Sequence, residues 1–126
     1  MQIEYVFPEG FRGAAVIREN QQNGTPPCKL PSLPTTYQCV LEFPVSGVLN
    51  IQGESPGKVW HNALARYAGG TSIPVPYNTP GTDVSRETIA LWTFGSVQQG
   101  EDWLFVGTED EFRKFKNEKE TYKYPH

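Results

Sequence analysis

One interior histidine, His61, has a side chain that could serve in catalysis. It could act as a general base for proton or acyl transfer if the fold placed it beside Ser72, Asp83 or Asp102. Such a base needs a nucleophile within hydrogen-bond reach. The residues around His61 spell no nucleophile elbow, paired-carboxylate motif or metal motif. A single histidine in this setting is more often a hydrogen-bonded residue at a sheet surface. The sequence therefore favours a protein that is not an enzyme.

The two cysteines, Cys28 and Cys39, offer either a disulfide or two free thiols. Cys28 lies in a proline-rich segment and Cys39 in a strand-like run. A bridge would tie an irregular loop to the sheet and contribute about 3 kcal/mol to stability. Small exported domains use such bridges, so we favour the disulfide over free thiols. A structural zinc site needs four ligands, which two cysteines and His61 do not supply. We predict a disulfide, and neither a metal nor another cofactor.

Residues 69–86 form the longest irregular stretch, GGTSIPVPYNTPGTDVSR. Its prolines remove backbone hydrogen-bond donors, which indicates a surface loop or an edge segment. As a loop it would present Ile73, Val75 and Tyr77 to a partner. Trp60 and Tyr67 are further partner-binding candidates, because aromatic side chains anchor many interfaces. The alternative is an edge strand whose apolar side chains pack against the core.

The chain changes abruptly from apolar to charged residues at Thr108. Thr108 and Glu111 have the spacing of a capping box, in which each side chain accepts from the backbone N–H of the other residue. Three carboxylates in the first turn suit the positive end of a helix and would repel a phosphate there. The junction therefore begins a helix and holds no ligand. The elements predicted from this point are a helix over 109–118, with Phe112 and Phe115 docked on a sheet, and an exposed tail over 119–126.

Size and charge exclude several classes of protein. A chain of 126 residues is expected to form one domain, 1–126, around one core. The net charge is −3, and no cluster of Lys or Arg stands without nearby Asp or Glu, so a nucleic-acid partner is not expected. No apolar run approaches the roughly 20 residues of a membrane helix. The N-terminus does not reveal the compartment, because a signal segment can have been removed.

Alternation of apolar and polar residues is the main structural signal. It predicts strands over 13–19, 37–43 and 48–52, with Asn23 and Gly24 in a turn. Because Ser46 and Gly47 are turn residues, we expect the second and third of these strands to form a hairpin-like pair.

Two later runs, 87–95 and 102–107, are apolar on both faces and are joined by a short polar linker, which predicts an antiparallel hairpin. Residues 59–68 fit either a helix or a strand. Strand is favoured, because turn residues precede them and the neighbouring elements are strands. The predicted fold is all-β or mainly β: an antiparallel β-sandwich with one C-terminal α-helix packed on the sheet.

Three blocks of sequence, VFPEGFRG, EFPVSGVL and WLFVGTEDEF, have a recognisable order. Their defining residues are Phe7, Pro8, Gly10, Phe11 and Gly13, then Pro44, Ser46, Gly47 and Leu49, then Phe105, Val106, Gly107 and Thr108. In order and spacing they resemble a family of uncharacterised bacterial domains that are often exported or lipid-anchored. The resemblance implies a cell-envelope β domain and brings no activity. The first two blocks resemble a transthyretin-type sandwich more loosely. Residues 28–34 and 69–86 depart from the family pattern.

These observations favour a non-catalytic protein-binding domain of the periplasm or cell envelope whose signal segment has been removed. One role that suits its size and acidity is an immunity or inhibitor protein that blocks a toxic effector enzyme. A carbohydrate- or peptidoglycan-binding module is an alternative, with Trp60, Tyr67 and Tyr77 as a stacking platform. A structural lipoprotein domain is a further alternative.

Overall fold

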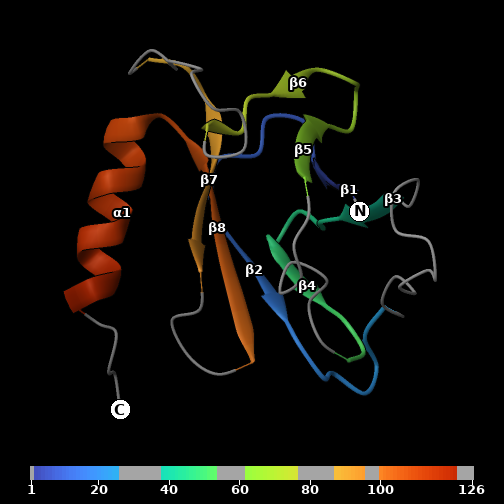
Figure 1. The fold of residues 1–126 in the computed structure, drawn as a ribbon. Helices are drawn as coiled ribbons and strands as arrows, with labels where there is room; N and C mark the ends of the chain where they lie inside the picture. Colours follow the sequence, from blue (N-terminus) through green and yellow to red (C-terminus); the bar gives the residue numbers. More distant parts are fainter. Residues whose placement is uncertain (1, 26–37, 54–61, 77–86, 96–99, 122–126) are drawn as a thin grey trace.

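The structure is a computed structural model that describes residues 2–25, 38–53, 62–76, 87–95 and 100–121. These residues form two four-stranded sheets and one helix (Figure 1). The elements in chain order are β1 (Gln2–Phe7), β2 (Gly13–Arg18), β3 (Gln38–Glu42), β4 (Val48–Asn50), β5 (Asn62–Tyr67), β6 (Ser72–Ile73), β7 (Ala90–Gly95), β8 (Glu101–Gly107) and α1 (Glu109–Thr121).

Sheet A has the strand order β3-β1-β5-β6, and sheet B has the order β4-β2-β8-β7. In sheet A the central strand β1 runs parallel to both β3 and β5, and β5 pairs antiparallel with β6. In sheet B, β2 is parallel to β4, whereas β2 with β8 and β7 with β8 are antiparallel. The protein is mainly β as predicted, but the prediction of an antiparallel sandwich is wrong, because both sheets are mixed.

The mixed pairing arises from turns that move the chain between sheets. The predicted hairpin of 37–43 with 48–52 does not form: β3 joins sheet A, and β4 joins sheet B. The turn between them is closed by a hydrogen bond from Gly47 N to Pro44 O of 2.9 Å. The predicted hairpin of β7 and β8 is confirmed. The described part of 59–68 is strand β5, as favoured, and His61 lies outside the described residues.

The core lies between the two sheets. Every second residue of β1, β2, β5 and β8 points into it. Burying each large apolar side chain contributes about 1.5–3 kcal/mol. The largest fully buried side chains are Phe7, Ile3, Ile17, Ile51, Leu91, Leu104, Val106 and Cys39.

A second apolar cluster joins α1 to the outer face of sheet B. Phe112 stacks on Trp92 with ring centroids 5.3 Å apart, and Phe115 stacks on Phe105 at 5.0 Å. The predicted docking of Phe112 and Phe115 on the sheet is therefore confirmed. The order of layers is sheet A, sheet B and helix (Figure 1). No helix among the described residues has the length and apolarity to cross a membrane.

The helix begins with the predicted capping box. Thr108 N donates to Glu111 Oε1 at 2.9 Å, and Glu111 N donates to Thr108 Oγ1 at 3.3 Å. Glu109 and Arg113 form an ion pair of 3.6 Å one turn apart. The helix ends at Thr121, three residues beyond the predicted boundary of 118, so residues 119–121 are helical and not part of a tail. Residues 122–126 lie outside the described residues.

Candidate functional site

The two sheets differ in what lies on their outer faces. Helix α1 packs on β7 and β8 and so covers that half of the outer face of sheet B. None of the described elements packs on the outer face of sheet A, which lies on the side of the molecule away from α1 (Figure 1). We call the outward-facing residues of β1, β3 and β5 the sheet A outer face.

The strand register places apolar and charged side chains side by side on the sheet A outer face. Glu4 of β1 is in register with Val40 of β3 on one side and with Leu64 of β5 on the other. In-register residues of adjacent parallel strands project from the same face. Glu4 Oε1 lies 3.2 Å from Nε of Arg66, which is one row further along β5. The central carboxylate is therefore paired, and an exposed apolar residue flanks it on each side.

The exposed large hydrophobic residues of the described chain all belong to sheet A or to the turn that follows β3. Val40 is 43% exposed, Leu64 is 47% exposed, and Val45 in the turn is 84% exposed. Single exposed apolar residues are ordinary on protein surfaces, and what distinguishes these three is that they share one sheet or its adjoining turn. The grouping becomes visible only when the strand register is known.

A hollow of about 430 Å³ opens at the end of this face. Phe7 and Phe43 line it and stack with centroids 4.8 Å apart, so this wall is fixed by the core. The full lining is Val6, Phe7, Pro8, Glu42, Phe43, Pro44, Val45, Arg66 and Ala68. We call it the apolar hollow, since most of these side chains are apolar.

A second hollow of about 430 Å³ lies beside it. Its lining is Asn23, Gly24, Thr25, Glu42, Phe43, Pro44, Val48, Leu49 and Asn50. We call it the polar hollow, because Asn23, Thr25 and Asn50 bring amide and hydroxyl groups to it. Residues 42–44 belong to both hollows and form the ridge between them. Glu42 on that ridge is exposed and forms no ion pair with any described residue.

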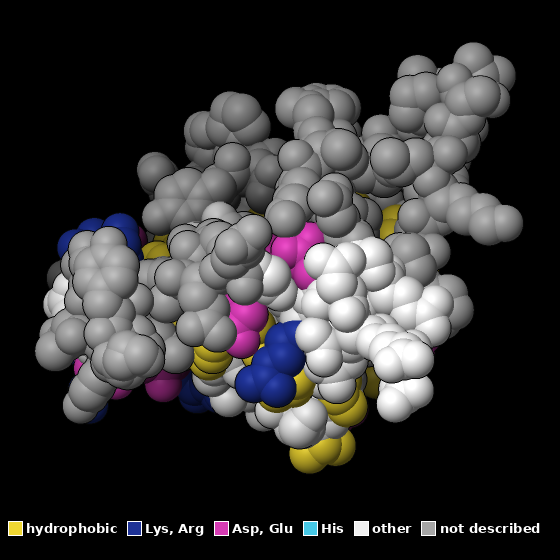
Figure 2. Space-filling model, turned by 90° about the horizontal axis from the view of Figure 1, so that it is seen from below, with side chains coloured by type: hydrophobic (Ala, Val, Ile, Leu, Met, Phe, Trp, Pro, Cys, Tyr) yellow, Lys and Arg dark blue, Asp and Glu magenta, His cyan; other side chains and the backbone are white. Residues whose placement is uncertain are grey.

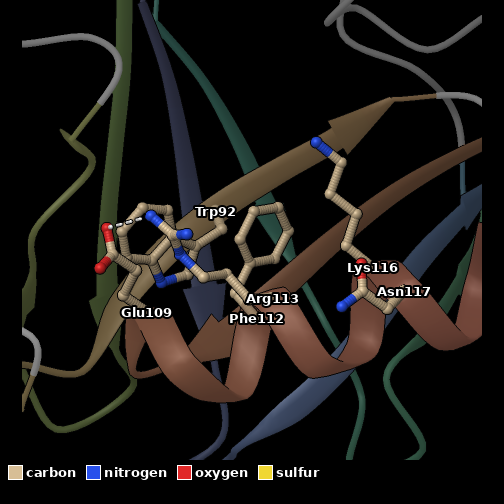
Figure 3. Close-up of a pocket in the computed structure, with 6 residues that line it drawn as sticks. All are labelled: Trp92, Glu109, Phe112, Arg113, Lys116 and Asn117. Atoms are coloured by element: carbon tan, nitrogen blue, oxygen red, sulfur yellow. Dashed lines mark ion pairs between the residues drawn. The ribbon is translucent and has the colours of Figure 1, made fainter.

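A third hollow, of about 370 Å³, follows the seam between α1 and β7 (Figure 3). Trp92 and five residues of the helix line it. Arg113 is drawn toward Glu109, and Trp92 Nε1 donates to Gly107 O at 2.9 Å. Glu109 and Arg113 pair with each other and Trp92 is bonded to the backbone, so the seam is better explained by helix packing than by ligand binding.

Charged side chains of opposite sign lie together on the described surface. In the view of Figure 2, basic side chains near the centre lie beside acidic ones. Arg18 and Glu101, in register on β2 and β8, are one such pair, with Nε and Oε2 3.5 Å apart. Charge is therefore mixed, and not gathered by sign, on the described part of this face.

The structure places two predicted partner-binding residues in the core. Ile73 and Val75 are only 3% and 8% exposed and pack in the main cluster. Pro74 O accepts a 2.8 Å hydrogen bond from Leu91 N, which holds this segment against β7. The prediction that Ile73 and Val75 are presented to a partner is wrong, and the packed edge segment is what forms. Tyr77 lies outside the described residues.

Tyr67, the described member of the predicted aromatic platform, is half-buried. Its hydroxyl donates to Phe11 O at 2.9 Å, and burial raises the pKa of Tyr67. The other members, Trp60 and Tyr77, lie outside the described residues, so the platform stays a prediction. Cys39 is buried in the core, whereas Cys28 lies outside the described residues, so the bridge between them also stays a prediction.

The described part of the structure leaves the catalytic hypothesis for His61 untested and contains no candidate metal site. His61 and Asp83 lie outside it, and no described group of three His, Cys, Asp or Glu residues could hold a metal ion. Burial raises the pKa of Tyr5, and the negative charge of Asp102 raises it further. Tyr5 is a core residue between the sheets, so this shift has a structural origin.

The three sequence blocks meet at one end of the sandwich, where their contacts are structural. Phe11 from the first block lies against Gly47 from the second. Arg12 from the first block pairs with Glu111 of the helix cap in the third. Glu9 accepts from Gly69 N in the turn after β5. These contacts give the three blocks a structural role in closing this end of the fold.

Comparison with known proteins identifies the fold only. No family model and no curated protein sequence matches the chain. A solved structure described as "Putative Lipoprotein from Bacillus anthracis" is similar, with a TM-score of 0.50 and 14% sequence identity. The match covers 92% of this chain and 78% of that one. At this level of identity the two proteins share an overall architecture.

Proposed function

We propose that the protein is a non-catalytic protein-binding domain of the bacterial cell envelope and that it binds its partner through the sheet A outer face. The observation that carries this proposal is the grouping of Val40, Val45 and Leu64 on or beside the one sheet face that no described element covers. Val40 and Leu64 offer apolar area that a partner can bury, and Glu4, which pairs with Arg66, lies between them.

The envelope location is supported by one observation and one prediction. The fold is similar to that of a protein described as a "Putative Lipoprotein". The predicted bridge between Cys28 and Cys39 would form in an oxidising compartment. A small acidic envelope domain suits the role of an immunity or inhibitor protein, so we propose that the partner is an enzyme that this domain blocks.

The test is affinity capture with face-specific variants. The immobilised protein is exposed to envelope and secreted fractions of the source cell, and bound proteins are identified by mass spectrometry. A Val40→Thr, Leu64→Thr double variant removes apolar surface and keeps residues with good strand propensity. Lys114→Gln, on the exposed face of α1, is the control.

A protein held by the wild type and by Lys114→Gln, but not by the double variant, is the expected result. If that protein is an enzyme, its turnover should fall when the domain is added at equal concentration. Capture that is equal for all three proteins would place the interface elsewhere, and capture of nothing would contradict the proposal. The melting temperatures of the three proteins should agree, because the substituted side chains are exposed.

A further inference from the structure

Residues 42–44 separate two hollows of different chemistry. The apolar hollow has Val6, Pro8, Pro44 and Val45 in its lining, and the polar hollow has the amides of Asn23 and Asn50. Each has a volume of about 430 Å³, and they share Glu42, Phe43 and Pro44 as a common wall. A ligand that fills both must pass over this ridge, which favours an elongated molecule over a compact one.

The walls on both sides of the ridge are held by backbone contacts. Phe43 N donates to Val6 O at 2.9 Å, which fixes the ridge to β1. On the polar side, Thr25 N donates to Asn50 O at 2.9 Å. A Cβ on Gly24 would lie 2.7 Å from the backbone of Ile51, so the turn packs directly on the strand. Preformed walls reduce the entropy that binding must overcome.

The charge at the ridge is negative. Glu4 and Arg66 pair at 3.2 Å and offset each other, whereas Glu42 has no partner among the described residues. Because Glu42 lines both hollows, its carboxylate lies where an occupant would cross the ridge. A complementary occupant carries a cation at this point, since a carboxylate at an interface favours a Lys or Arg of the partner.

We infer that the two hollows bind an extended segment of a partner protein, with an apolar side chain in the apolar hollow and a Lys or Arg side chain against Glu42. Residues i and i+2 of an extended chain project from the same face about 7 Å apart, so one short segment can place both side chains. Polar groups of the same segment then meet the amides of the polar hollow. The inference rests on the proposed function and adds the chemistry of the partner.

The test uses random seven-residue peptides displayed on phage and selected on the immobilised protein. Enriched peptides are synthesised, and their Kd is measured by fluorescence anisotropy on wild type, Glu42→Gln and Val45→Asp. Glu118→Gln, an exposed carboxylate of α1, is the matched control for Glu42→Gln. Both residues at the site are exposed, so we expect the variants to fold, and circular dichroism checks this.

We expect enriched peptides to carry Lys or Arg two positions from an apolar residue. The Kd of these peptides should be at least tenfold higher for Glu42→Gln and for Val45→Asp than for wild type. For Glu118→Gln it should be less than twofold higher. Peptides without a basic residue, peptides that bind Glu42→Gln as well as wild type, or no enrichment would overturn the inference. If peptide binding is weakened by Val45→Asp alone, the proposed contact of a Lys or Arg with Glu42 is wrong, but the apolar hollow remains the binding site. Capture that depends on Val40 and Leu64, with no peptide enriched, would leave the proposed function standing.

Discussion

Arg12 and Glu111, which are 99 positions apart in the sequence, form an ion pair. The Arg12 guanidinium, in the loop after β1, donates to Glu111 Oε1 in the first turn of α1. The same oxygen accepts from Thr108 N at 2.9 Å, so one carboxylate serves both the helix cap and the loop. Both charged side chains are 46% exposed, and an exposed ion pair contributes at most about 1 kcal/mol. The cap should therefore matter more for stability than the pair.

Removing the cap hydroxyl should destabilise the fold measurably. Thr108→Ala deletes the acceptor of the Glu111 N–H bond, and loss of such a cap costs about 1 kcal/mol. Urea denaturation measures the change in the free energy of unfolding. Thr71→Ala, at an exposed position, is the control and should change it by less than about 0.5 kcal/mol. Equal effects of the two substitutions would contradict a stabilising role of the cap.

The contribution of Glu111 should depend on pH. The backbone N–H of Thr108, followed by Arg12, lowers the pKa of Glu111 below its ordinary value of 4.5. A carboxylate with a lowered folded-state pKa stabilises the fold fully above its unfolded pKa, and this contribution is lost as the pH falls through the folded value. The free energy of unfolding should therefore be higher for wild type than for Glu111→Gln, and this difference should be largest at neutral pH. It should become smaller as the pH falls below 4.5.

Urea denaturation between pH 7 and pH 3 measures that gap. Thr71→Ala, which changes no titratable group, should differ from wild type by a nearly constant amount and separates this effect from the general acid sensitivity of the protein. A gap for Glu111→Gln that stays constant down to the lowest pH would show that the cap does not act through the ionised carboxylate.

Two glycines with nearly the same backbone conformation should respond differently to substitution. Gly10 has φ +74° with open space around a new Cβ, whereas Gly47 has φ +77° and a new Cβ would lie 2.9 Å from the ring of Phe11. Gly10→Ala should cost about 1–2 kcal/mol through the backbone alone. Gly47→Ala should cost about 1–3 kcal/mol more, because it also overpacks the contact with Phe11. Equal unfolding free energies for the two variants would show that the Phe11 ring moves freely.

Local sequence patterns predicted the elements better than their pairing. The capping box of Thr108 and Glu111 and the β7–β8 hairpin depend on neighbouring residues, and both are confirmed. Alternation of apolar residues marks which side of a strand is buried but not which sheet the strand joins. For this reason the crossing between β3 and β4 resembled a hairpin in the sequence, since Ser46 and Gly47 suit either kind of turn.

The candidate site could not be predicted because its residues come together only through register. Val40 and Leu64 each occur once on an otherwise polar strand face, which is unremarkable in a sequence. Parallel pairing of β3 and β5 with β1 places them on either side of Glu4. In the proline-rich segment the error was the reverse, because residues predicted to be exposed are buried. Pro74 has no N–H to donate, but its carbonyl accepts from Leu91 N, so Ile73 is buried and not presented.

Because Ile73 is buried and Leu64 is exposed, truncation of Ile73 should mainly reduce stability, whereas truncation of Leu64 should mainly reduce partner binding. Ile73→Ala should lower the free energy of unfolding by about 2–5 kcal/mol, because it leaves a cavity in the core. Leu64→Ala should change it by about 0.5 kcal/mol or less, since the side chain is 47% exposed. Urea denaturation and the melting temperature distinguish them. Ile73→Ala should weaken partner capture only at temperatures where the variant begins to unfold, whereas Leu64→Ala should weaken it at full stability. If a fully folded Ile73→Ala variant no longer captured the partner, the proline-rich segment would be part of the interface.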